Sequence, residues 1–224
     1  MKLVTFQSLE AVKDLFEKGY LECDNTKINS DKIGYAYEWI VNKMNKSIEN
    51  KYHTSYPIWC WVKCYKDICP PKRKGEKVQS YDVKITFQKD EKDVFITDFR
   101  RYSFLLNNMY IPDSIKDKIN FEEKLNKFNI TKEELKAYIR KDKYDGHRTD
   151  TEFLDICNEI RKSFDKCITK ESDILQGCVW RINLDEIESV EILKNDGYRY
   201  GSLNYIRSNG KRMDWIQDYY KKLK

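Results

Sequence analysis

Several features that identify common classes of enzyme and membrane protein are missing from this chain of 224 residues. It has only two histidines, and no serine or cysteine lies in a setting typical of a catalytic triad. It has eight glycines, and none of them forms a phosphate loop of the Walker or dinucleotide-binding type. No apolar run approaches membrane-spanning length, so we expect no membrane partner.

A targeting leader and a complete metal motif are also missing. Residues 1–4 run directly into an expected strand, so we expect a cytoplasmic protein with reduced thiols. The seven cysteines are odd in number and irregularly spaced. Cys60, Cys64 and Cys69 form a cluster, but a zinc ion normally takes four ligands in two close pairs. We therefore expect no metal cofactor.

The chain is rich in aromatic and charged side chains. Aromatic residues make up 14% of the sequence and charged residues 35%, which predicts a folded polar protein with an aromatic core. The net charge of +5 is a mild basic excess that is compatible with a nucleic-acid or nucleotide partner. Adjacent glutamates occur in two segments that we expect to be solvated helices, which favours surface charge over acid–base chemistry.

Residues 56–63 contain two tryptophans two positions apart, in a pattern typical of a strand. Alternation divides the strand into two faces. One face carries Trp59, Trp61 and Lys63, and the other carries Ile58, Cys60 and Val62. One interpretation is that both indoles pack beneath a helix. The other is that they form a pocket wall, where flat rings stack on a base or nicotinamide and the lysine meets a phosphate.

Other polar residues are expected at strand ends. Gln7 precedes a helix that Ser8 is suited to cap, and a helix N-terminus presents free N–H groups to ligands. Gln176 precedes Gly177 at the start of a late strand, a place for close backbone approach. Asp98 follows another strand and is interpreted either as a site carboxylate or as a helix N-cap. Tyr102, four residues after Asp98, is a further candidate for stacking. The candidate site therefore consists of Gln7, Trp59, Trp61, Lys63, Asp98, Tyr102 and Gln176.

The spacing of apolar residues predicts an α+β protein. Steps of three and four residues predict helices over residues 33–48, 99–110, 114–126, 131–141 and 150–164. Alternation predicts strands at 81–87, 94–97 and 179–182. We expect a single domain over residues 1–224, with a mixed, mostly antiparallel central sheet flanked by helices. Residues 113–170 form a helical insert that covers a sheet edge or acts as a lid.

A basic segment at residues 72–77 follows the tryptophan strand. It is interpreted either as a solvated loop or as a surface that attracts phosphate. Together with nearby aromatic residues, it supports an alternative function as a non-enzymatic module that binds nucleic acid or a protein partner. A third interpretation places every tryptophan in the core and the function on another surface.

Several short motifs occur in an order that resembles a known family. They are Thr5-Phe6-Gln7 with Gly19, Tyr37-Glu38-Trp39, Pro57-x-Trp59-x-Trp61, Asp98-Phe99 with Tyr102, and Gln176-x-x-x-Trp180. This order resembles a family of small bacterial cytosolic proteins known as a domain of unknown function. The family name implies no activity.

The opening order of strand, polar residue, helix, glycine, aromatic residue and leucine is similar to ADP-ribosyltransferases that modify nucleic acid and to tRNA 2′-phosphotransferases. This likeness implies NAD as cofactor, with nucleic acid or protein as substrate. Gln7 would contact NAD near the nicotinamide ribose, and the aromatic strand would wall the nicotinamide.

In the same likeness, Gln176 would stand where the family carries its catalytic glutamate. A neutral amide supplies neither the charge nor the base of a carboxylate. Three alternatives follow: the protein binds without transferring, another acid such as Asp98 or Asp173 serves, or the likeness does not hold.

Overall fold

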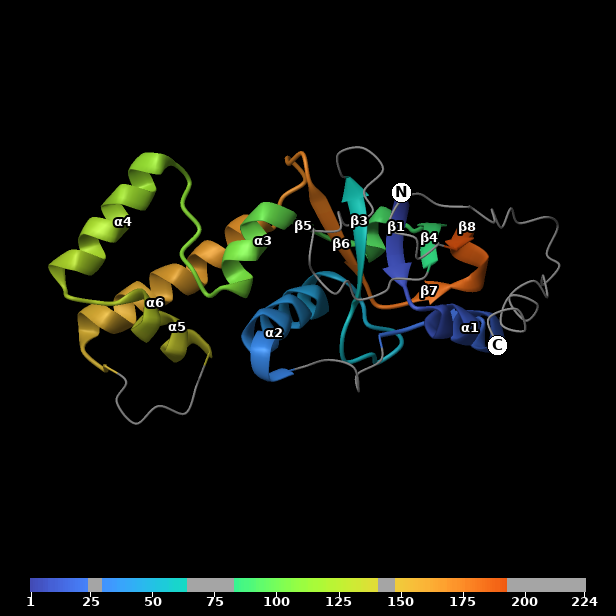
Figure 1. Cartoon of the computed structure of the whole chain (residues 1–224), viewed down its shortest axis with the longest axis horizontal. Helices are drawn as coiled ribbons and strands as arrows, with labels where there is room; N and C mark the ends of the chain where they lie inside the picture. The colour runs from blue at the N-terminus through green and yellow to red at the C-terminus, as the bar shows by residue number, and fades with distance from the viewer. Residues whose placement is uncertain (24–29, 64–82, 141–147, 193–224) are drawn as a thin grey trace. The chain divides into compact units, whose positions relative to one another are not determined.

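The computed structural model describes residues 1–23, 30–63, 83–140 and 148–192 (Figure 1). The chain divides into two compact units. Unit 1 takes its residues from Met1–Asn25, Ile48–Phe95 and Gln176–Lys224, and unit 2 from Thr26–Ser47 and Ile96–Leu175. Unit 1 contains most of the strands, and unit 2 contains most of the helices.

The sheet is antiparallel in every pairing whose register is described. Strand β1 pairs with β3 on one side and with β4 on the other, and β4 pairs with β8. The strand order is β5-β6-β3-β1-β4-β8, and β2 pairs with β7 in a separate small sheet. The expected α+β class with a mostly antiparallel sheet is confirmed. The strands are β1 (Lys2–Gln7), β2 (Tyr20–Leu21), β3 (Ile58–Lys63), β4 (Val83–Gln88), β5 (Phe95–Asp98), β6 (Leu175–Val179), β7 (Ile182–Asn183) and β8 (Ile187–Ile192).

One face of the central strands forms the core of unit 1. The register places Leu3 opposite Phe87 and Thr5 opposite Ile85. Leu3, Ile85 and Phe87 are fully buried, and Thr5 is nearly so. The Thr5 hydroxyl donates a hydrogen bond to the Trp59 carbonyl oxygen at 2.8 Å, so its burial leaves no unmatched donor.

Helix α1 (Leu9–Lys18) begins and ends as its sequence predicts. The Ser8 hydroxyl accepts a hydrogen bond from the Ala11 N–H, which caps the first turn. Gly19 follows the helix with φ of 84°, a left-handed conformation that favours glycine.

Unit 2 is built mainly from helices α2 to α6, each as expected from apolar spacing. Ser114 and Asp150 cap α4 and α6, because each side chain accepts a backbone N–H of the first turn. Thr131 and Glu134 cap the start of α5 reciprocally. The helices are α2 (Ser30–Ser47), α3 (Phe99–Leu106), α4 (Ile115–Lys127), α5 (Lys132–Arg140) and α6 (Thr151–Ser163).

Three expected boundaries are wrong. Helix α2 begins at Ser30 rather than at residue 33. Helix α3 ends at Leu106 rather than Tyr110, and Asn108 has φ of 52°, which no continuing helix allows. The late strand β6 lies at Leu175–Val179 rather than 179–182. The expected close approach at Gly177 is present, because an added Cβ would lie 3.0 Å from Cys60 Sγ and 2.9 Å from Val94 Cγ1.

The same described ranges contain neither a membrane-spanning helix nor a group of metal-binding side chains. There, no helix combines the length and apolar character needed to cross a bilayer. No group of three or more potential metal-binding side chains gathers in those ranges either. Cys60 and four other described cysteines are free thiols, whereas Cys64, Cys69 and the basic segment at 72–77 lie outside the described residues.

Candidate functional site

The residues of the predicted site are divided between the two units. Unit 1 holds Gln7, Trp59, Trp61, Lys63 and Gln176. Asp98 and Tyr102 belong to unit 2. The two sets are therefore described separately.

Gln7 and the tryptophans lie on opposite faces of the sheet. Val4 pairs with Trp61, so these two side chains share a face. Gln7 lies three residues after Val4 in β1, so its side chain points to the opposite face, which is the core face. There its Nε2 donates a hydrogen bond to the Thr5 hydroxyl at 2.9 Å. The expected convergence of Gln7 with the indoles is absent from this arrangement.

Gln176 does share the face of the tryptophans. A Cβ on Gly177 would meet Cys60 and Val62, which lie on the core side of β3. Gln176 precedes Gly177 in β6, so alternation places it on the other face, with Trp59. Trp59 and Gln176 are half-buried, and β6 and β3 are neighbouring strands. Lys63 occupies the last position of β3.

Asp98 and Tyr102 serve the structure of unit 2. The Asp98 carboxylate accepts a hydrogen bond from the Arg101 N–H at 3.0 Å, so the cap interpretation of Asp98 is confirmed. Tyr102 is only 3% exposed, which leaves its ring no free face on which a ligand could stack.

Unit 1 contains a compact cluster of charged groups, which we call the Arg181 cluster. The Arg181 guanidinium donates a hydrogen bond from Nε to Glu22 Oε1 at 2.8 Å, and its Nη2 donates a second hydrogen bond to the same oxygen. It also lies 3.9 Å from the ring centroid of Tyr20 and 3.8 Å from that of Tyr52. These contacts combine an ion pair with two cation–π interactions.

Lys89 completes the Arg181 cluster from the end of β4. Its ammonium donates to the Arg181 carbonyl oxygen at 2.9 Å and to the Glu186 carboxylate at 2.7 Å. The side chain is only 7% exposed, so its charge depends on these partners. The cluster holds β4, β7 and the loop after β2 together, and its charges are paired within the fold.

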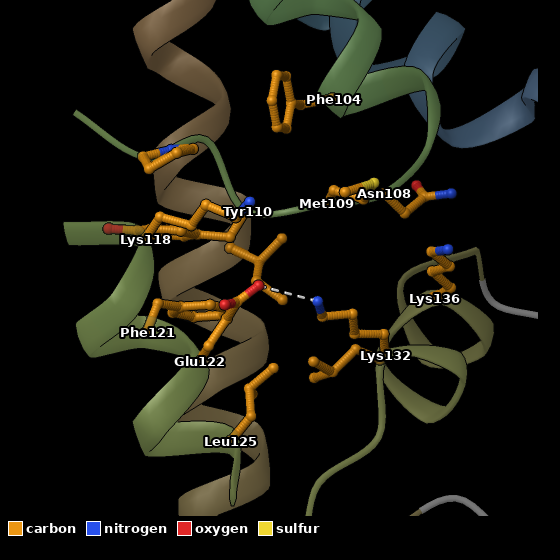
Figure 2. A pocket seen from close by; sticks show the side chains of 13 residues that line it. Phe104, Asn108, Met109, Tyr110, Lys118, Phe121, Glu122, Leu125, Lys132 and Lys136 are labelled. Atoms are coloured by element: carbon orange, nitrogen blue, oxygen red, sulfur yellow. Dashed lines mark hydrogen bonds and ion pairs between the residues drawn. The ribbon is translucent and has the colours of Figure 1, made fainter. Parts of the chain in front are cut away.

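Unit 2 contains a cavity of about 140 Å³ lined by the end of α3, the segment that follows it, and helices α4, α5 and α6 (Figure 2). Its walls are mainly apolar and aromatic. The lining residues are Phe104, Asn108, Met109, Tyr110, Pro112, Lys118, Phe121, Glu122, Leu125, Lys132, Leu135, Lys136 and Ile160. We call this cavity the unit 2 pocket.

Helical spacing explains how α4 and α5 each present several side chains to the unit 2 pocket. On α4 the lining residues lie at steps of three and four, as expected for one face of a helix. They are Lys118, Phe121, Glu122 and Leu125. On α5 the same spacing selects Lys132, Leu135 and Lys136, so two lysines four residues apart reach one cavity (Figure 2).

Asn108 is the buried polar group in this lining. It is 5% exposed, and its carbonyl oxygen Oδ1 has no hydrogen-bond partner among the residues that the structure describes. A buried acceptor without a donor costs about 1–3 kcal/mol. Asparagine is among the residues that tolerate the left-handed φ of 52° found here. Asn108 is a lining residue, but its Oδ1 has essentially no accessible surface, so this acceptor is closed off from the cavity.

Tyr110 forms a rigid aromatic wall with Phe121. The two rings are stacked, with centroids 4.1 Å apart. The Tyr110 hydroxyl donates to the Asp117 carboxylate at 3.1 Å. Burial and this hydrogen bond to Asp117 raise the pKa of Tyr110 to about 12. Tyr110 therefore stays neutral throughout the physiological range.

The charges around the unit 2 pocket are unequal. Lys132 Nζ lies 3.0 Å from Glu122 Oε1, and this hydrogen bond lowers the pKa of Glu122 (Figure 2). The Lys132 side chain is 55% exposed and that of Glu122 is 40% exposed, so the pair is worth at most about 1 kcal/mol. Lys118 and Lys136 form no ion pair within the described part of the chain. Among the residues that line the pocket, three lysines outnumber one glutamate, while Asp117 lies just outside the lining against the Tyr110 hydroxyl.

The unit 2 pocket was not predicted from the sequence. The clearest available signal was the segment from Asn107 to Tyr110, where asparagines that end a helix precede apolar residues. Nothing in the spacing showed that Asn108 would be buried without a donor. Burial depends on residues far apart in the sequence, and most of the pocket lining comes from helices α4, α5 and α6, later in the chain.

Comparison with known proteins gives one family match. The model of the family described as Domain of unknown function (DUF3841) matches residues 2–188. This match covers most of the chain, so the protein belongs to the DUF3841 family, and the resemblance to a domain of unknown function is confirmed. No curated protein and no solved structure gives a significant match. The likeness to ADP-ribosyltransferases stays a prediction.

Proposed function

We propose that this member of the DUF3841 family binds a small organic ligand in the unit 2 pocket. The observation that carries the proposal is the cavity itself, which measures about 140 Å³ and combines mainly apolar and aromatic walls with three lysines and one glutamate. Binding sites typically combine apolar walls with a few polar groups that fix orientation.

The size of the cavity restricts the ligand. A cavity of about 140 Å³ is close to the roughly 150 Å³ of an engineered apolar cavity that binds benzene. Sites for drug-sized ligands measure about 300–1,000 Å³. The unit 2 pocket therefore suits a single ring or a group of similar size, and a complete dinucleotide exceeds it.

A ligand-observed NMR screen tests this proposal with single-ring compounds, both neutral and charged. Met109 lies at the pocket and is 36% exposed, so Met109→Trp places a larger side chain there without replacing a buried one. Phe99→Trp is the control, because Phe99 is 38% exposed and outside the lining. We expect binding by the wild type and the Phe99 variant and loss of binding in the Met109 variant. No binding at millimolar concentration, or binding unaffected by Met109→Trp, would contradict the proposal.

A second candidate function is the binding of NAD or another nucleotide by unit 1. It is supported by the placement of Trp59, Trp61 and Gln176 on one face of neighbouring strands. The proposal is limited to binding without transfer, because Gln176 is a neutral amide and Asp98 caps a helix.

Thermal unfolding with NAD tests the second candidate. A ligand at one hundred times its Kd adds about 2.7 kcal/mol of stability, which raises Tm measurably. An unchanged Tm at millimolar NAD would count against it. Steeply salt-dependent binding to polynucleotide would instead favour the nucleic-acid-binding alternative.

A further inference from the structure

We infer that the unit 2 pocket and the exposed apolar side chains beside it form a docking surface for an acidic segment of a partner protein, one aromatic side chain of which enters the pocket. The inference rests on the proposed function, because the pocket that accepts a single-ring compound then accepts a ring carried by the partner. It combines three observations: exposed apolar side chains next to the pocket, a preformed aromatic wall, and lysines on two sides.

Two exposed isoleucines extend the pocket lining along α4. Ile115 is 81% exposed and Ile119 is 48% exposed. Ile115 lies three residues before the lining residue Lys118, and Ile119 lies three residues before Glu122, which also lines the pocket. Residues three apart are neighbours on a helix, so the isoleucines, which we call the α4 strip, adjoin the lining. Isolated exposed hydrophobic residues are ordinary, whereas a group of them beside a cavity marks an interaction site.

The pocket is suited to anchor one aromatic side chain. Its volume of about 140 Å³ is close to that of a cavity that binds benzene, which is the ring of phenylalanine. Tyr110 and Phe121 are stacked with centroids 4.1 Å apart, so this wall is in place before a partner arrives. Interfaces commonly gain affinity from an aromatic anchor in a central pocket, surrounded by contacts that exclude water. The α4 strip supplies such surrounding contacts.

The lysines of the lining favour an acidic partner. Lys118 and Lys136 form no ion pair within the described part of the chain. Lys118 comes from α4 and Lys136 from α5, on opposite sides of the pocket (Figure 2). They are therefore suited to separate carboxylates spread along a segment rather than to one small anion. Lys116, which is exposed three residues before Ile119, adds a third cation beside the α4 strip.

The carboxylates of α4 do not cancel this positive charge. The helix carries three of them, and two have partners. Glu122 accepts a hydrogen bond from Lys132 at 3.0 Å, and Asp117 accepts one from the Tyr110 hydroxyl. The third, Glu123, lies four residues after Ile119, where helical spacing places it on the side away from the pocket. The surface therefore attracts acidic side chains and disfavours basic ones.

Selection from a random peptide library displayed on phage, with the full chain as target, tests the inference without assuming a partner sequence. We expect the enriched peptides to carry a net negative charge and at least one phenylalanine or tyrosine. Fluorescence polarisation of synthetic copies then gives their Kd. Replacing the aromatic residue of a peptide by alanine should weaken binding about tenfold or more, because the pocket loses its anchor.

Variants of the chain assign the apolar contacts. Ile119→Gln should weaken the enriched peptides about tenfold, because an isoleucine that binding buries is lost. Ile168→Gln is the matched control, because Ile168 is 42% exposed in unit 2 and lies outside the lining, and it should leave Kd unchanged. Met109→Trp, which narrows the pocket, should weaken the peptides as it weakens single-ring compounds. An unchanged Tm shows that each variant keeps its fold.

Charge variants assign the lysines. Lys118→Met and Lys136→Met should each weaken binding several-fold and reduce its dependence on salt, because cations at the rim of an interface act through screened attraction. Lys162→Met, on an exposed position of α6 outside the lining, is the control and should change neither property.

Four results would overturn the inference or part of it. Enrichment of basic peptides would refute the acidic partner, and unchanged affinity for Ile119→Gln would refute the α4 strip as a contact. Unchanged affinity for Met109→Trp would refute anchoring in the pocket. Enrichment of no peptide, while single-ring compounds bind, would refute the docking surface and leave the proposed function intact. Failure of the single-ring screen as well would refute the proposed function itself.

Discussion

The Arg181 cluster of unit 1 and the unit 2 pocket use similar residues in opposite ways. In the cluster, Lys89 and Arg181 each meet a carboxylate and lie beside backbone or aromatic partners. In the pocket, Lys118 and Lys136 form no ion pair within the described ranges, and Asn108 keeps an unused acceptor. The cluster therefore uses its polar groups to hold strands together, whereas the pocket lining contains lysines that form no ion pair within the described ranges.

The largest expected effect is on the free energy of unfolding, which should distinguish the paired Lys89 of the cluster from Lys136 of the pocket. Lys89→Ala removes a buried ammonium and leaves the Glu186 carboxylate without its partner, which should lower the free energy of unfolding by about 3 kcal/mol. Lys136→Ala should change it by no more than about 0.5 kcal/mol, because Lys136 makes no ion pair that the structure describes. Urea denaturation measures both values. Similar losses in the two variants would remove the distinction.

The next effect compares two glycines, one from each unit. Gly177→Ala should destabilise the protein by about 1–3 kcal/mol, since its Cβ would lie within 3.0 Å of Val94 and Cys60 side-chain atoms. Gly34→Ala in α2 should stabilise it by about 0.5–1 kcal/mol, because its Cβ meets no atom within 4 Å and alanine favours a helix. Thermal unfolding should therefore give opposite changes in Tm. Changes of the same sign would mean that the backbone at one site differs from this description.

The smallest expected effect concerns the neutral Tyr110 wall of the pocket. Its pKa of about 12 lies above the value near 10 expected for an unfolded tyrosine, so the folded state favours the protonated phenol. The stabilisation is complete below pH 10 and is lost as the pH rises from about 10 to about 12. Tyr110→Phe keeps the ring and removes this ionisation.

Urea midpoints at pH 9 and pH 11.5 should therefore fall less in the Tyr110→Phe variant than in the wild type. The difference between the two proteins isolates Tyr110 from the lysines and other tyrosines, which titrate in both. An equal fall in both proteins would show that Tyr110 ionises with an unperturbed pKa.

Much of the local structure could be predicted because its causes are local. Ser8 and Gly19 mark the ends of α1 by capping and by a left-handed φ. The alternation in β3 correctly placed Ile58 and Cys60 on the core face, where both are buried. Apolar spacing also located the helices of unit 2, except that α3 ends four residues earlier than expected.

The predicted site could not be assembled in the same way. Period-two alternation gives the two faces of a single strand, but only pairing relates one strand to another. The register of Val4 with Trp61 separates Gln7 from the indoles, and no feature of either segment fixes that register by itself. Asp98 had two interpretations from sequence, and the hydrogen bond from Arg101 decided between them.

The sequence by itself determined where helices and strands form, which faces are apolar, and that the chain belongs to the α+β class. Those properties depend on residues a few positions apart, whose propensities and spacing act within one element. Only the tertiary structure decided that Asn108 lacks a donor and that lysines from two helices reach one cavity. Burial and hydrogen-bond satisfaction depend on groups brought together from distant parts of the chain, so they are settled only when the elements pack.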